Sequence, residues 1–161
     1  MTRGFFAAFL LGLVLGGGGA RADEPAAAPR FVSQRVETAY MREGPSYAHK
    51  VLWVYRHKGY PLQVIASFDI WRRVRDRDGT VGWMNSDMLS DNRTVLVTGQ
   101  GRVQLHASDD LSSKVVGLAE PGAILSLKAC HAQACRASAK NADGWIAKDR
   151  LWGVSAEETF K

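Results

Sequence analysis

The chain has few of the side chains on which catalytic and metal sites usually depend. Its 161 residues include only 2 Cys and 4 His. It contains no His-Glu-x-x-His zinc motif, and Gly44-Pro45-Ser46-Tyr47-Ala48 does not satisfy the Gly-x-Ser-x-Gly pattern of a nucleophilic serine. Because these motifs are missing, we expect no enzymatic activity, no metal and no cofactor.

Long apolar runs are also scarce, and the one that is present lies at the N-terminus. Arg3 precedes an apolar run from Phe5 to Leu15, and Ala20-Arg21-Ala22 follows it. This pattern predicts a secretory signal peptide over residues 1–22, and the run is too short to span a bilayer. No Cys follows the run to accept a lipid, so we expect a periplasmic or secreted protein without stable membrane insertion.

A strong excess of charge of one sign is absent from the mature chain. Arg3 and Arg21 belong to the predicted signal peptide, which has no acidic residue, so 19 of the 21 basic residues remain against 16 acidic ones, a net charge of +3. This charge is too small to indicate a nucleic-acid partner.

The only two cysteines are Cys130 and Cys135. In an exported chain they should form a disulfide, and the four residues between them suit the two arms of a hairpin. A structural zinc site would need a second pair of ligands, and only His131 lies beside them. A catalytic thiol is a weaker alternative, because Cys130 and His131 are neighbours on a predicted strand and would point to opposite faces.

Helical periodicity longer than one turn is absent from the mature chain, which consists of short apolar segments separated by polar turns. Between Trp71 and Leu89 the sequence predicts two strands joined by a type I′ turn at Asp78-Gly79, and then a single helical turn capped by Asn85. The predicted fold class is therefore all-β.

The second half of the chain repeats the pattern of the first. Gly144-Trp145 matches Gly82-Trp83, and Leu151 follows Trp145 by the same number of residues as Leu89 follows Trp83. Matching residues of the two halves are 62 positions apart at Gly-Trp and 64 positions apart at the earlier strands. We attribute this difference to a shorter hairpin in the second half. The sequence therefore predicts a duplicated β-domain.

Duplication predicts the domain organisation after the signal peptide. Each copy is expected to close into a small β-barrel, because closure removes exposed strand edges. The residues after the second copy are too few for a catalytic domain. The predicted segments are a flexible mature N-terminus at 23–30, a first domain at 31–90, a second at 91–153 and a C-terminal tail at 154–161.

One family accounts for this pattern. Tyr40-Met41-Arg42-Glu43-Gly44-Pro45-Ser46, Trp71, Asp78-Gly79-Thr80-x-Gly82-Trp83 and Leu89 together resemble the bacterial SH3-like (SH3b) domain. The mature chain resembles exported proteins built of two such domains. The resemblance implies small, partly open β-barrels that often bind cell-wall glycopeptide or protein segments without catalysis, frequently beside a wall hydrolase.

The second copy departs from the family pattern. His106-Ala107-Ser108 stands where Arg-x-Gly-Pro-Ser is usual, and Cys135 occupies the position of Trp71 when the halves are aligned by sequence. No aromatic residue lies between Arg93 and Asp143. We therefore expect any binding site in the first copy.

A candidate binding surface follows from strand alternation around Trp71. Alternation places Trp71, Arg73, Arg75 and Arg77 on one face and turns Val74 inward. An exposed indole beside guanidinium groups can stack on a sugar or a proline and pair with carboxylates. The alternative is that Trp71 covers the barrel mouth or the surface between the copies, while the arginines are only solvated.

Further aromatic residues are assigned to this surface or to the core. Tyr47 and Tyr60 lie next to turn prolines, and we expect them to complete the groove with Trp71. Phe68 and Trp83 are expected to fill the core.

The sequence thus leads to three functional hypotheses. The first is a non-catalytic periplasmic binding or scaffolding module that recognises cell-wall peptidoglycan through its glycopeptide. The second is an adaptor that contacts another envelope protein through the same residues. The third and weakest is a hydrolase that uses Cys130 with His131.

Overall fold

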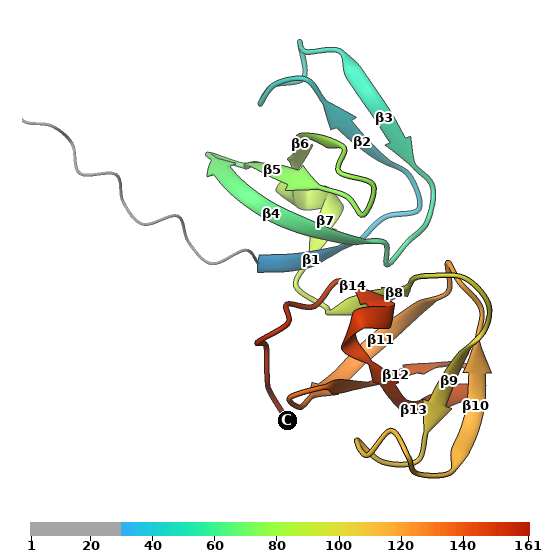
Figure 1. Ribbon diagram of the computed structural model, residues 1–161. Coiled ribbons are helices and arrows are strands. Elements are labelled where there is room, and N and C mark those ends of the chain that lie inside the picture. Colours follow the sequence, from blue (N-terminus) through green and yellow to red (C-terminus); the bar gives the residue numbers. More distant parts are fainter. Residues whose placement is uncertain (1–29) are drawn as a thin grey trace, which may run out of the picture.

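The computed structural model describes residues 30–161 as two antiparallel sheets of seven strands each (Figure 1). The first contains β1 Arg30–Gln34, β2 Ala39–Arg42, β3 Val51–Tyr55, β4 Pro61–Phe68, β5 Trp71–Arg75, β6 Val81–Asn85 and β7 Leu89–Ser90. The second contains β8 Thr94–Val97, β9 Val103–His106, β10 Val115–Ala119, β11 Ile124–Cys130, β12 Ala134–Ala139, β13 Ala142–Ala147 and β14 Leu151–Trp152. The strand orders are β3-β2-β6-β5-β4-β1-β7 and β10-β9-β13-β12-β11-β8-β14.

This architecture confirms the predicted all-β class and the two tandem domains. The predicted signal peptide and residues 23–29 of the predicted flexible segment lie outside the described residues. Within 30–161 the structure has no helix with the length and apolar character needed to cross a bilayer.

Each sheet curls around its own hydrophobic core. In the first domain Met41, Leu62, Val74 and Met84 are fully buried, and Val74 points inward as alternation predicts. In the second domain the core is made of smaller aliphatic and alanine side chains and includes both cysteines. The disulfide between Cys130 and Cys135 is confirmed, and it joins cross-strand partners in β11 and β12.

The two domains share the same irregularities of register, which supports duplication. A bulge between Val64 and Ala66 in β4 has its counterpart between Leu127 and Ala129 in β11. When the two domains are aligned by their strand pairing, the second is two residues shorter than the first over this region. The two missing residues lie in two different loops rather than in one hairpin. One residue is missing from the loop between β10 and β11, and the other from the turn between β12 and β13.

The shared register also corrects the alignment of Cys135 with Trp71. Trp71 pairs with Asn85, which precedes the 3₁₀ turn η1 Ser86–Met88. Ala134 pairs with Ala147, which precedes the 3₁₀ turn η2 Lys148–Arg150. The residue at the Trp71 position in the second domain is therefore Ala134. The alignment made from the sequence is wrong by one residue at this position. It placed both missing residues in the turn after β12, whereas one of them is missing before β11.

The turn between β5 and β6 differs from the predicted type I′ turn. Type I′ requires positive φ at both central residues, and Gly79, at +87°, is the one residue of this turn with positive φ. The buried carboxylate of Asp76 accepts hydrogen bonds from the N–H groups of Asp78 at 3.0 Å and Thr80 at 2.8 Å. These bonds stabilise a wider loop that needs positive φ only at the glycine. The predicted cap is confirmed, since Asn85 Oδ1 accepts from the N–H of Asp87 at 2.8 Å.

The two domains touch through β1 and the start of β4 on one side and through β8 and β14 on the other. The rings of Phe31 and Trp152 meet edge to face at 5.3 Å, and Trp152 Nε1 donates to the carbonyl of Pro61 at 3.2 Å. Thr94 Oγ1 donates to the carbonyl of Gly59 at 2.6 Å. Both hydrogen bonds join a side chain of the second domain to a backbone carbonyl of the first.

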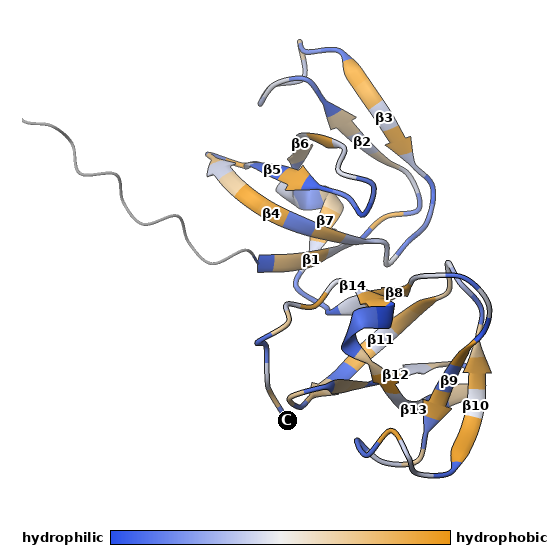
Figure 2. Cartoon of the chain, viewed as in Figure 1, coloured by the Kyte–Doolittle hydropathy of each residue, from blue (hydrophilic) through white to orange (hydrophobic). Residues whose placement is uncertain are grey.

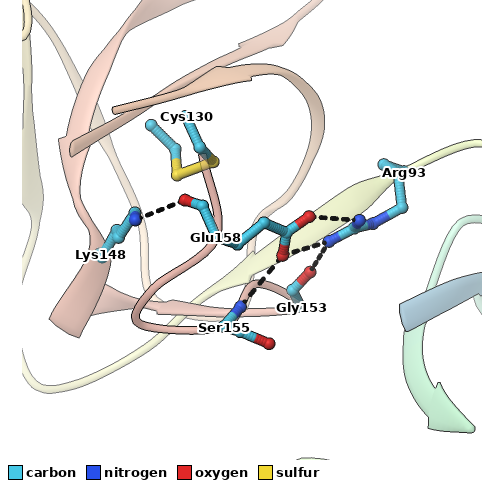
Figure 3. A network of polar contacts seen from close by, with 7 residues as sticks. Arg93, Cys130, Lys148, Gly153, Ser155 and Glu158 are labelled. Carbon is cyan, nitrogen blue, oxygen red and sulfur yellow. Dashed lines mark hydrogen bonds and ion pairs between the residues drawn. A yellow bond between two sulfur atoms is a disulfide. The ribbon is translucent and has the colours of Figure 1, made fainter. Parts of the chain in front are cut away.

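The segment 154–161, expected as a tail, packs back onto the second domain (Figure 3). The Glu158 carboxylate accepts from Arg93 Nη1 at 2.6 Å and Nη2 at 3.1 Å, and from the N–H of Ser155 at 3.1 Å. Phe160 forms a β-bridge with Cys130. Arg93 also lies 5.8 Å from the centre of the Phe31 ring, so one guanidinium contacts both the C-terminal segment and the first domain.

This ion pair predicts a pH-dependent contribution to stability. Burial raises the pKa of Glu158. Hydrogen bonds from Arg93 and from the N–H of Ser155 lower this pKa by a larger amount, so the net shift is downward. A carboxylate with a lowered pKa stabilises the fold above its unfolded pKa of about 4.3, and this contribution is lost as the pH falls through the folded pKa. At pH 7, Glu158→Gln should lower the free energy of unfolding by about 1–2 kcal/mol.

Urea unfolding at neutral and acidic pH measures this contribution. The difference between wild type and Glu158→Gln should shrink in acid. Glu120→Gln is the matched control, because its ion pair with Arg102 is exposed and worth less than about 1 kcal/mol. A Glu158→Gln effect that stays the same at both pH values would contradict the assignment.

Candidate binding surface of the first domain

The outer face of the first sheet carries a cross-strand row of one tryptophan between two arginines. Trp83 in β6 pairs with Arg42 in β2 on one side and with Arg73 in β5 on the other. Residues directly opposite in an antiparallel pair point to the same face. Arg75 lies two residues further along β5 and is exposed on this face too. The predicted alternation of Trp71, Arg73 and Arg75 opposite Val74 is therefore correct.

The exposure expected for Trp71 is wrong. Trp71 is only 5% exposed, and the ring of Tyr47 packs edge-on against it at 5.0 Å. The loop between β2 and β3 folds over the start of β5 and covers the indole. Tyr47, which is 63% exposed, is the ring that this cluster presents to solvent.

Two polar residues that the sequence analysis did not assign to the site hold Tyr47 in place. Asn85 Nδ2 donates to the Tyr47 hydroxyl at 2.8 Å. Arg42 Nη1 donates to the carbonyls of Tyr47 at 3.1 Å and His49 at 2.8 Å, and its guanidinium lies 5.5 Å from the centre of the Tyr47 ring. The tyrosine is thus fixed at both its backbone and its hydroxyl. No periodicity connects Tyr47 with Asn85, which lie 38 residues apart.

Phe68 and Trp83, which were expected in the core, contribute to this surface instead. Phe68 is 60% exposed at the end of β4, where it pairs with Trp71, and Trp83 is half-buried. The core does not need them, because it is filled by the methionines and aliphatic side chains of the inner face. The outer face therefore carries Tyr47, Phe68 and Trp83, above a buried Trp71, and also Tyr40, which lies two residues before Arg42 in β2 and is 40% exposed.

Tyr60 does not belong to this surface. Its ring lies 5.3 Å from that of Tyr55 and lines a cleft with Asp76. This cleft lies past the C-terminal end of β5, whereas Trp71 is the first residue of that strand. The predicted groove of Tyr47, Trp71 and Tyr60 does not form. Tyr47 and Trp71 lie together, and Tyr60 lies in a separate cleft.

The arginines of the two domains differ in their electrostatic partners. In the described part of the chain neither Arg73 nor Arg75 forms an ion pair. Arg136 occupies the position of Arg73 in the second domain, and its Nε lies 2.8 Å from Asp143 Oδ1. The guanidinium groups of Arg73 and Arg75 thus remain available to an external carboxylate.

A histidine packs against the corresponding tryptophan of the second domain. Trp145 takes the place of Trp83, and the ring of His131 lies 4.5 Å from it. His131 Nδ1 in turn lies 2.6 Å from Asp109 Oδ2, and this hydrogen bond lowers the pKa of Asp109. The corresponding face of the second domain therefore satisfies its own polar groups.

The structure also tests the thiol and metal-site alternatives raised for Cys130 and Cys135. Both cysteines of the chain are joined in the disulfide, so the hypothesis of a Cys130 hydrolase has no free thiol. From Arg30 to Lys161 no group of three or more His, Cys, Asp or Glu side chains is placed to hold a metal ion.

Comparison with known families decides the relationship. Residues 35–91 and 101–153 each match the family model described as "Bacterial SH3 domain". The chain belongs to the bacterial SH3 domain family. Bacterial SH3 domains are generally modules that bind cell walls or proteins, and here two such domains follow each other in tandem.

Two solved structures show a weak likeness to this chain. NlpC2 from Trichomonas vaginalis is 9% identical with a TM-score of 0.36, and the match covers 78% of this chain and 48% of that one. NlpC1 from the same organism is 11% identical with a TM-score of 0.36, covering 88% and 50%. The chain therefore spans about half the length of these structures. No curated protein matches it.

The burial of Trp71 in the first SH3 domain predicts a structural role for its ring. Trp71→Ala should lower the free energy of unfolding by about 3–5 kcal/mol, because it removes a large buried side chain beneath Tyr47. Trp53→Ala removes a tryptophan that is 57% exposed and should cost less than about 1 kcal/mol. Urea unfolding of both variants makes the comparison, and equal losses would contradict the burial of Trp71.

Proposed function

We propose that the protein is a non-catalytic module of the cell envelope that binds cell-wall glycopeptide through the outer face of its first SH3 domain. The observation that carries this proposal is the pair of exposed guanidinium groups, Arg73 and Arg75, which lack an ion pair within residues 30–161 and lie beside Trp83. Wall glycopeptide combines sugar rings with peptide carboxylates, the two groups that this face suits.

The chemistry of the face favours such a ligand. Aromatic rings stack on the C–H face of a sugar, and guanidinium groups bind carboxylates with two parallel hydrogen bonds. Tyr47, Phe68 and Trp83 would supply the rings, and Arg73 and Arg75 the charges. The family's general role in binding cell walls or proteins supports the same assignment.

The proposed location is the periplasm or the cell exterior. The N-terminal run from Phe5 to Leu15 and the site at Ala20-Arg21-Ala22 support export. The disulfide supports it independently, because disulfides persist in oxidising compartments. The second SH3 domain would then hold the first in position rather than bind the wall itself.

Co-sedimentation of the purified mature protein with isolated sacculi tests the proposal. Wild type should pellet with the sacculi, and Arg73→Gln/Arg75→Gln should bind about tenfold more weakly, which corresponds to about 1.4 kcal/mol. Raising the salt concentration should weaken wild-type binding, because the contacts are charged and exposed.

Arg136→Gln is the matched control, since it removes an arginine from the same position of the second SH3 domain. It should bind sacculi like wild type. The proposal is wrong if wild type stays in the supernatant, or if the two first-domain substitutions leave the pelleted fraction unchanged.

The exposed edge strands favour a second candidate function, an adaptor that binds another envelope protein. β3 and β10 lie at the ends of their sheets and are apolar along most of their length (Figure 2). Most of their side chains are exposed. An open edge can accept an extended segment of a partner as an additional strand. The exposed residues include Val51, Leu52, Val115, Val116 and Leu118.

Site-specific photocrosslinking in cells separates the two functions. A photoreactive residue at Leu52 on the edge strand should capture a discrete envelope protein if the adaptor function holds. The same residue at Arg73 should capture wall material if the wall-binding function holds. A protein captured at both positions would favour the adaptor and argue against wall binding.

A further inference from the structure

A second concave site lies past the C-terminal end of β5, at the other end of the strand from Trp71. It is a cleft of about 390 Å³ between β3, the loop after it and the turn that joins β5 to β6. Aromatic and acidic side chains make up most of its lining: Trp53, Tyr55, Tyr60, Asp76 and Asp78. Neither the outer face nor the disulfide shares any of these residues.

The base of the cleft holds a buried carboxylate without a cationic partner. Asp76 is 5% exposed, and in the described part of the chain it forms no ion pair. Its Oδ2 accepts from the Tyr55 hydroxyl at 2.7 Å, and its Oδ1 accepts from the N–H groups of Asp78 and Thr80. Protein donors therefore already occupy both oxygens. The carboxylate offers the cleft negative charge rather than unused hydrogen-bond acceptors.

Three aromatic rings line the cleft around this charge. Trp53 is exposed, and the rings of Tyr55 and Tyr60 lie 5.3 Å apart at an interplanar angle of 41°. Burial raises the pKa of both tyrosines, and the charge of Asp76 raises it further, so the phenols stay neutral. The faces of neutral aromatic rings attract cations.

The charges at the mouth of the cleft do not cancel the charge at its base. Arg56 and His57 are exposed, where water and salt screen them. Asp78 is also exposed and pairs with Arg77 at 3.2 Å. Asp76 is therefore the one buried charge among the residues that line the cleft.

The second SH3 domain shows that the fold does not require these side chains. Shared register places Gly117, Ala119, Ala123 and Ala139 at the positions of Trp53, Tyr55, Tyr60 and Asp76. The wider turn of the first domain accounts for the bonds to Asp76 Oδ1, but it does not account for the aromatic rings. A ligand that binds only the first domain would account for the three aromatic rings together with Asp76.

We infer that this cleft binds a quaternary ammonium group, with Trp53, Tyr55 and Tyr60 around the cation and Asp76 as its buried counter-charge. A quaternary ammonium ion donates no N–H hydrogen bond, so it matches a carboxylate whose oxygens are already occupied. Its methyl groups suit aromatic walls, as in aromatic cages for such ions. This inference is independent of the proposed wall binding, because the residues involved are different.

Choline and its neutral carbon isostere, 3,3-dimethyl-1-butanol, test the inference, because they have nearly the same shape and differ in charge. Each is titrated into ¹⁵N-labelled mature protein, with NaCl added to keep the ionic strength equal. Choline should shift the indole N–H signal of Trp53 saturably, with a dissociation constant on the order of millimolar. The neutral isostere should bind at least about tenfold more weakly, because it lacks the charge.

Variants locate the site and separate it from the outer face. Trp53→Ala changes an exposed side chain and should fold, and it should abolish the choline shifts in Tyr60 and in the turn from Asp76 to Thr80. Asp76→Asn should weaken choline binding if it folds, and Trp53→Ala keeps the test decisive if it does not. Arg73→Gln/Arg75→Gln should bind choline like wild type, so sacculus binding and choline binding can fail separately.

Three outcomes would overturn the inference. The isostere could bind as tightly as choline, which would make the cleft merely apolar. N-acetylglucosamine could shift the Trp53 signal while choline does not, which would make it a sugar site. Choline could leave all residues of the cleft unshifted.

Discussion

The packing of Tyr47 onto Trp71 determines what the first domain presents to water. Asn85 and Arg42 fix the loop between β2 and β3 over the start of β5, and this buries the largest side chain of the strand. The strand itself would place Trp71 outside, beside its arginines. With the indole covered, the solvent-facing surface includes Tyr47, Phe68, the half-buried Trp83 and the exposed guanidinium groups. A backbone pattern shared by both domains thus acquires a distinct outer surface through one loop.

The two domains show how little of this surface the fold itself demands. Strand order, bulges and 3₁₀ turns are the same in both. In the second domain Asp143 neutralises Arg136, and His131 packs against Trp145. Its core consists mainly of valine and leucine and includes a disulfide, whereas the first domain packs methionines, Tyr55 and leucine around its centre. Duplication preserved the barrel, and the two copies diverged in which charges remain open to a partner.

The repeated strands, the helical turn after Gly-Trp and the disulfide were predictable, because strand alternation, capping and cysteine spacing are local signals. Exposure of individual aromatic residues was not. Burial of Trp71 depends on a loop that returns from 24 positions earlier, and the place of Phe68 depends on where β4 leaves the barrel. The separation of Tyr60 from Tyr47 required the relative positions of the two ends of β5. Long-range contacts of this kind leave no periodic trace in a sequence.

Chemical-shift mapping with soluble wall fragments tests the central claim most directly, namely that the outer face of the first SH3 domain is the surface that meets the wall. Labelled mature protein titrated with muropeptides should show saturable shifts at Tyr47, Phe68, Arg73 and Trp83, with Trp145 and its neighbours in the second domain unaffected. Shifts centred on Trp145, or saturable binding that leaves β5 and β6 unperturbed, would contradict the account.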